Sequence, residues 1–143
     1  MAERKAAHAD LKILSKTFGV LTSELEETLS SLTVCSYGPE APVLKEAESG
    51  TNVYVALKGR LSVRHSRWLF LTKEVAQLKP GDLFGEIGFI LPTTRSASVV
   101  ALEPCEVARI VLDDLKKLLD RHSELRARIE EMARRRMYSL AES

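Results

Sequence analysis

The chain has 143 residues, with 21 Lys and Arg against 20 Asp and Glu, so its formal net charge is +1. This length fits one domain with a substantial core. The near-neutral charge argues against a surface built for nucleic acid or an anionic membrane, and no apolar stretch reaches the roughly 20 residues of a membrane-spanning helix. Two cysteines without metal-like or disulfide spacing, and no signal segment, predict a reducing cytoplasmic location.

The N-terminal part of the sequence predicts two short helices ahead of a sheet. Residues 1–10 are small and charged, which fits either a helical lead-in or a disordered end. Beyond them, apolar residues recur at helical intervals at Leu11, Leu14, Phe18 and Leu21. Thr22-Ser23-Glu24 then has the pattern of a new N-cap. We therefore expect N-terminal helices within residues 11–33.

Extended segments dominate residues 34–111. They are short and separated by turns that contain glycine or proline, and the expected strands cover 43–45, 52–58, 60–65, 68–75, 96–101 and 105–111. Short strands at such regular spacing predict a sandwich or jelly roll rather than alternating strand–helix–strand units. The expected fold class is therefore mainly β, a jelly-roll β-sandwich or barrel flanked by N-terminal helices and a C-terminal pair of helices.

Residues 112–138 are predicted to form that helix pair. In the last helix, residues spaced by four, three and four share one face, and they are Leu125, Ile129, Met132 and Arg136. An arginine, Arg136 or its neighbour Arg135, therefore ends an apolar stripe and is a candidate for contacting a ligand. Cations near a helix C-terminus also complement the helix dipole, so a simply solvated basic end is the alternative.

The segment 81–97 has the features of an anion site. Gly81-Asp82 predicts a turn, after which the apolar run from Ile87 to Leu91 is long enough for one or two helical turns. Even one turn presents backbone N–H groups without internal partners, and these favour a phosphate. Gly85 and Gly88 lack a Cβ, so a ligand can approach the main chain closely, although the same glycines also serve ordinary turn chemistry.

Two charged residues of this segment have different expected roles in binding a ligand. The planar guanidinium of Arg95, at the start of the next extended run, can bind two phosphate oxygens at once. Ionised Glu86 only accepts hydrogen bonds, which suits a sugar hydroxyl better than a phosphate. The alternative for Arg95 is a structural ion pair with a surface carboxylate.

These residues carry a family resemblance. Phe84-Gly85-Glu86-Ile87-Gly88, followed after six residues by Arg95-Ser96-Ala97, resembles the phosphate-binding cassette of cyclic nucleotide-binding domains. Upstream, Glu48-Ser49-Gly50 with residues 52–59 resembles the glycine-marked strand, turn and strand of that family. Thr51 departs from the family pattern, which commonly has an acidic residue there, and Gly88-Phe89 stand where Ala-Leu is more usual.

The resemblance extends over about residues 11–136. It implies one cyclic nucleotide-binding domain across 1–143, with N-terminal helices at 11–33, a β-roll at 34–111 that carries the cassette at 81–97, and C-terminal helices at 112–138.

The resemblance also implies roles for individual residues. Arg95 would pair with the cyclic phosphate, Glu86 would accept the ribose 2′-hydroxyl, and Ser96 would lie near the phosphate and purine. The last helix would fold over the base as a lid, with Arg135 or Arg136 facing the purine. The expected ligand-binding residues are Phe84, Gly85, Glu86, Ile87, Gly88, Arg95, Ser96, Ala97, Arg135 and Arg136. The ligand would be cyclic AMP or cyclic GMP, with no cofactor, metal or catalytic residue.

The expected function is sensing rather than catalysis. The sequence lacks a Gly-x-x-x-x-Gly-Lys-[Ser/Thr] loop, a Gly-x-Ser-x-Gly elbow and a zinc-deaminase-like Cys/His set. The resemblance implies that ligand binding is passed through the C-terminal helix to a channel, a kinase or another effector. Two alternatives stay open: the sensor part of a truncated transcription regulator, and a stand-alone scaffold with a vestigial pocket. The base preference, the oligomeric state and the effector are open as well.

Overall fold

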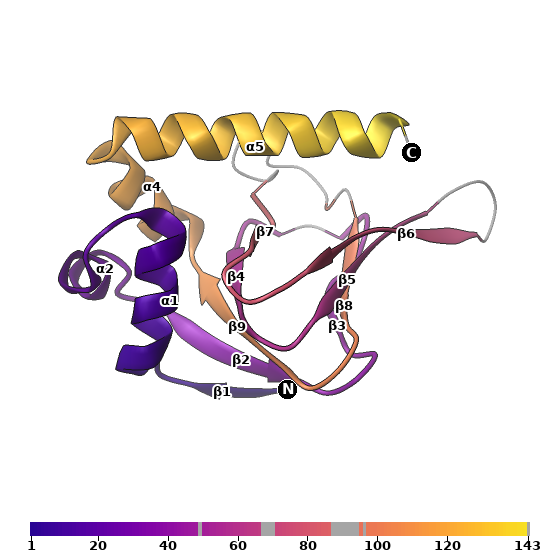
Figure 1. Cartoon of the computed structure of the whole chain (residues 1–143), viewed down its shortest axis with the longest axis horizontal. Coiled ribbons are helices and arrows are strands. Elements are labelled where there is room, and N and C mark those ends of the chain that lie inside the picture. Colours follow the sequence, from indigo (N-terminus) through magenta and orange to yellow (C-terminus); the bar gives the residue numbers. More distant parts are fainter. Residues whose placement is uncertain (49, 67–70, 87–94, 96, 143) are drawn as a thin grey trace.

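The computed structural model describes residues 1–48, 50–66, 71–86, 95 and 97–142. In these residues two antiparallel sheets face each other, with helices on the outer side of one sheet and a long C-terminal helix along the top of the roll (Figure 1). The structure confirms the predicted mainly β fold class, a β-sandwich flanked by helices at both ends of the sequence.

The helices of the described part are α1 (His8–Phe18), α2 (Thr22–Thr28), α4 (Leu112–Asp120) and α5 (Ser123–Glu142). The strands are β1 (Ala2–Arg4), β2 (Thr33–Tyr37), β3 (Pro42–Leu44), β4 (Val53–Lys58), β5 (Leu61–Ser66), β6 (Thr72–Leu78), β7 (Leu83–Phe84), β8 (Ser98–Ala101) and β9 (Cys105–Ile110). The first helix begins at His8, ahead of the predicted start at Leu11, and β6 runs on to Leu78, beyond the predicted end at Val75.

Strands that are distant in sequence lie side by side, as expected for a jelly roll. The five-stranded sheet has the order β1-β2-β9-β4-β7, and the four-stranded sheet has the order β3-β8-β5-β6. All the pairings are antiparallel, and β9 lies between β2 and β4, with Val34 opposite Ala108 and Val55 opposite the same residue. The short strand β7, which leads into the candidate cassette, therefore forms one edge of the five-stranded sheet.

The five-stranded sheet separates two hydrophobic cores. Along β4, Val53 and Val55 pack with the helices, whereas Tyr54 and Ala56 pack inside the roll against the other sheet. The same alternation continues in β9, where Ala108 belongs to the helix side. Because successive strand residues point to opposite faces, a run of buried residues such as Val53 to Leu57 serves both cores at once.

Helix α5 is anchored at its N-terminal half. Leu125, Ile129 and Ala133 are buried, and the first two pack into the core shared with α1, α2 and α4. The Arg128 guanidinium also donates a hydrogen bond of 3.2 Å to the carbonyl of Phe18 at the end of α1. The beginning of α5 is therefore fixed to the N-terminal helices, and the rest of the helix extends along the roll (Figure 1).

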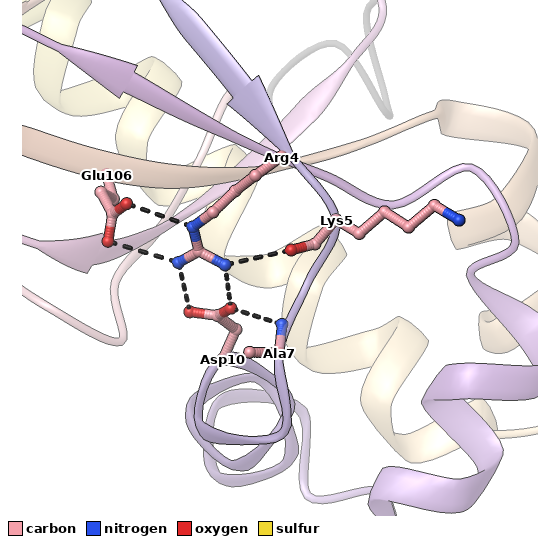
Figure 2. A network of polar contacts seen from close by, with 5 residues as sticks. All are labelled: Arg4, Lys5, Ala7, Asp10 and Glu106. Carbon is pink, nitrogen blue, oxygen red and sulfur yellow. Dashed lines mark hydrogen bonds and ion pairs between the residues drawn. The ribbon is translucent and has the colours of Figure 1, made fainter.

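The N-terminus forms an edge strand, which differs from the predicted helical lead-in or disordered end. Strand β1 pairs with β2, with Glu3 opposite Cys35, although all three of its residues are exposed. Arg4 binds Asp10 at 2.7 Å and Glu106 at 3.3 Å, while the Asp10 carboxylate also accepts a 2.7 Å hydrogen bond from the Ala7 amide (Figure 2). One guanidinium thus joins β1, the start of α1 and β9.

Asp10 is the buried member of this network. Its hydrogen bonds from Arg4 hold the pKa of the carboxyl below its ordinary value, because the ionised form is the one that accepts them. The folded-state pKa is lower than the unfolded one. The resulting stabilisation is therefore present above the ordinary aspartate pKa of about 4 and is lost as the pH falls through the folded-state value.

We predict that Asp10→Asn lowers the free energy of unfolding at neutral pH by about 1 to 2 kcal/mol, since a charge-assisted pair with a partly exposed arginine is lost. Urea denaturation at pH 7 and at about pH 3 measures this, and the difference from the wild type should shrink at the lower pH. Asp113→Asn is the matched control, because Asp113 is also in the first turn of a helix but is exposed. Equal losses for the two variants would contradict the prediction.

Candidate functional site

Main-chain hydrogen bonds between the segment after β3 and the segment before β8 position Arg95. The Arg95 amide donates to the carbonyl of Glu48 at 2.8 Å, and the amide of Ala47 donates to the carbonyl of Arg95 at 2.8 Å. Nearby, the Glu46 amide donates a 2.8 Å bond to the hydroxyl of Ser98. These bonds continue the pairing of β3 with β8 and hold Arg95 just ahead of β8.

The guanidinium of Arg95 is half-buried and is held by main-chain oxygens. Nη2 donates to the carbonyl of Asn52 at 2.8 Å, and Nη1 donates to the carbonyl of Gly85 at 3.4 Å. Burial lowers the pKa of Arg95, which means that the charge is carried there at a cost in free energy. No carboxylate in the described part of the chain lies within 4.0 Å of this guanidinium.

Two glycines leave the space that this guanidinium occupies. Gly85 has a φ of +80°, which L side chains rarely adopt, and a Cβ there would lie 3.1 Å from the carbonyl oxygen of Asn52 and 3.3 Å from Nη1 of Arg95. At Gly50 the backbone is unstrained, but a Cβ would lie 3.0 Å from both Nε and Nη2 of Arg95. The arginine therefore passes between two turns that each need a residue without a side chain.

Glu86 follows directly after Gly85 and is one of the most buried charged residues, at 1% exposed. Its Oε1 accepts a 2.7 Å hydrogen bond from Nη1 of Arg136, on helix α5. The same nitrogen of Arg136 donates to the carbonyl of Leu83 on β7 at 2.6 Å. The carboxylate next to the cassette turn is thus paired with the C-terminal helix, fifty positions away in the sequence.

The structure brings Gly85, Glu86, Arg95 and Arg136 together and places two other predicted residues elsewhere. Phe84 is buried inside the roll and stacks on Tyr54, with ring centroids 5.2 Å apart. The side chain of Arg135 is 72% exposed and lies 3.8 Å from Glu131 on its own helix, so the ion pair within α5 accounts for it. Of the two arginines left open by the sequence, Arg136 is the one that contacts Glu86.

Part of the predicted cassette lies outside the residues that the structure describes. The expected helical turn at 87–91, the return loop at 92–94 and Ser96 lie outside the described residues, and with them the candidate ligands Ile87 and Gly88. Ala97 is half-buried between Arg95 and β8. Its proposed contact with a ligand stays a prediction.

Sequence reasoning missed two acceptors, the carbonyl oxygens of Asn52 and Leu83, that bind the arginines of the site. Every residue has such a carbonyl, so no side-chain signal could have revealed them.

Within the described ranges, no three or more His, Cys, Asp and Glu side chains form a group that could hold a metal ion. None of the helices described here combines the length and apolar character needed to cross a bilayer.

Residues 34–122 match the family model described as "Cyclic nucleotide-binding domain". The chain is 31% identical over 105 residues to a cGMP-dependent protein kinase of Eimeria tenella, covering 73% of this chain and 10% of the kinase. It is 27% identical over 103 residues to a cyclic AMP receptor protein of Thermus thermophilus, covering 72% of this chain and 48% of the receptor. The chain thus spans about half or less of the length of these relatives.

A solved structure agrees with the sequence matches. The crystal structure of Thermus thermophilus catabolite activator protein superposes with a TM-score of 0.73 at 25% identity, covering 84% of this chain and 56% of that chain. Together these matches confirm the family resemblance found in the cassette and the fold class.

We predict that Gly85→Ala destabilises the protein by about 1 to 3 kcal/mol, because the new Cβ meets a strained backbone conformation and a crowded site. Thermal and urea unfolding measure the loss. The control is Gly38→Ala, where an added Cβ has no atom within 4 Å and the backbone is not left-handed. That variant should stay within about 0.5 kcal/mol of the wild type. A Gly85→Ala protein as stable as Gly38→Ala would argue against the described turn.

Proposed function

The chain belongs to the cyclic nucleotide-binding domain family, and on this premise we propose that it binds a cyclic mononucleotide between Arg95 and Glu86. Cyclic AMP is the first candidate and cyclic GMP the second. The names of the two relatives point to both nucleotides, since one is a cGMP-dependent protein kinase and the other a cyclic AMP receptor protein.

The observation that carries the proposal is the state of Arg95. Its guanidinium is half-buried, its pKa is lowered by that burial, and within the described part of the chain it donates hydrogen bonds to two neutral carbonyls. A half-buried cation without a carboxylate in direct contact is costly, and a diffusible anion that binds beside it relieves the cost. The fork of N–H donors matches two oxygens of a phosphate, and a cyclic phosphate presents such a pair.

A sugar beside the phosphate would fit the second charged group. Glu86 is the residue after Gly85, whose carbonyl accepts a bond from Arg95, so the carboxylate and the guanidinium flank the same turn. An ionised carboxylate is a hydrogen-bond acceptor, as a ribose hydroxyl requires. Contacts of Ile87, Gly88, Ser96 and Ala97 with the ligand are part of the proposal and stand on the family resemblance.

We further propose that helix α5 passes the binding event to an effector rather than taking part in catalysis. Support comes from its position: one end is fixed to the N-terminal helices, and Arg136 reaches the residues of the candidate site. Binding shifts such an element only if the ligand favours one position of the helix over another. Regulation of a kinase, a DNA-binding module or a channel through this helix stays a prediction.

We predict that calorimetric titration with cyclic AMP and cyclic GMP detects binding of at least one of them. Arg95→Ala should weaken that binding by about thirtyfold or more, because a charge-assisted pair worth at least about 2 kcal/mol is lost. Arg60→Ala is the matched control, since the side chain of Arg60 is exposed and donates a 3.4 Å hydrogen bond to Gln77. A vestigial pocket would instead show no heat with either nucleotide and no difference between the two variants.

Gly50→Ala separates the geometry of the site from the stability of the fold. We predict that this variant binds the nucleotide about tenfold or more weakly, because its Cβ displaces the guanidinium of Arg95, yet unfolds at nearly the wild-type temperature. Gly38→Ala is again the control, with open space around the added carbon. Full affinity in Gly50→Ala would show that the position of the guanidinium does not matter for binding.

A further inference from the structure

Arg136 is the side chain that joins helix α5 to the candidate ligand site. A single nitrogen, Nη1, donates to the carbonyl of Leu83 at 2.6 Å and to Oε1 of Glu86 at 2.7 Å. Strand β7 is at the edge of its sheet, so the Leu83 carbonyl takes its bond from the helix rather than from another strand. Glu86 is nearly inaccessible to solvent, and Arg136 forms a 2.7 Å ion pair with it.

The carboxylate of Glu86 has a second oxygen that this contact does not use. Arg136 binds Oε1, and no hydrogen bond joins Oε2 to any residue in the described part of the chain. A carboxylate offers about four acceptor positions over its two oxygens. A hydroxyl group can therefore bind Glu86 without displacing Arg136, and displacement would exchange a charge-assisted bond for a weaker one.

We propose that Arg136 is a positioning residue: it holds the Glu86 carboxylate in the orientation in which Oε2 accepts the 2′-hydroxyl of the bound nucleotide, which gives helix α5 a part in selecting ribose over deoxyribose. This inference rests on the proposed nucleotide binding and adds to it. It assigns Arg136 to the sugar side of the site, whereas the family resemblance implies an arginine that faces the purine.

The arrangement also predicts how α5 responds to the ligand. The hydroxyl and the arginine share one carboxylate, and a hydrogen bond to each makes the same orientation of Glu86 more favourable. Coupling of this kind is reciprocal: if the helix strengthens binding of the hydroxyl, the hydroxyl strengthens docking of the helix by the same factor. An autoinhibitory contact would have the opposite sign, because the ligand would have to break the pair between Arg136 and Glu86.

The test compares two ligands that differ by one hydroxyl group. Cyclic AMP and 2′-deoxy-cyclic AMP are titrated calorimetrically into the wild type, Arg136→Ala and Arg135→Ala, with cyclic GMP and its deoxy form used instead if the wild type prefers guanine. We expect the wild type to bind the ribose form about tenfold more tightly, as for one hydrogen bond to a charged group. In Arg136→Ala this ratio should fall below about threefold, and in Arg135→Ala it should be unchanged.

Arg135 is a suitable control because it is the next residue on the same helix, has the same charge and is 72% exposed. Arg136→Gln serves as a second variant that keeps a side-chain N–H donor without the charge, and its ratio should lie between those of the wild type and Arg136→Ala. Circular dichroism melting shows whether each variant is folded. Because α5 is anchored through Leu125, Ile129 and Ala133, the loss of Arg136 should leave the fold intact.

The outcomes separate this inference from the proposed function. If the wild type binds and discriminates but the folded Arg136 variants discriminate equally well, the inference is wrong and nucleotide binding stands. Tighter binding of cyclic AMP by Arg136→Ala would also overturn it, since that result means the arginine competes with the ligand. If the wild type binds neither nucleotide, the proposed function fails and this inference fails with it.

Discussion

A half-buried guanidinium surrounded by neutral oxygens is the constraint on which the candidate site depends. The carbonyls of Asn52 and Gly85 turn their negative ends toward Arg95 and offset part of the cost of its burial. These two carbonyls belong to turns that are far apart in the sequence, so one side chain fixes the turns relative to each other. Gly50 and Gly85 are needed for the same reason, because a side chain at either position would push the guanidinium out of place.

The five-stranded sheet lets the fold combine a rigid interior with a helical layer on the outside. Residues such as Tyr54 and Phe84 pack between the two sheets, while Val53 and Val55 pack under the helices. The helices and the interior of the roll therefore have separate clusters of buried side chains. Arg136 crosses from the helical layer to the edge strand β7 and joins the two by a polar contact.

The sequence predicts the parts of this molecule that repeat or that depend on side-chain type. Strand alternation and turn residues predict most strands of the β-roll but not β2 or β7, and the types and spacing of Glu86 and Arg95 predict the candidate site. Strand β1 was missed because Ala2–Arg4 has no alternation of its own, and its conformation depends on pairing with β2 and on contacts of Arg4. The partner of Arg136 was missed for a related reason: spacing along a helix shows which residues share a face, but not what that face meets.

The contact between Glu86 and Arg136 has an evolutionary consequence. A buried carboxylate that loses its cation is destabilising, and so is a cation left without its acceptor beside the same edge strand. A change at either position therefore creates selection for a compensating change at the other. Relatives that lack the arginine should carry a neutral residue or a differently placed base opposite position 86, so the helix and the cassette turn should be inherited as one covarying unit.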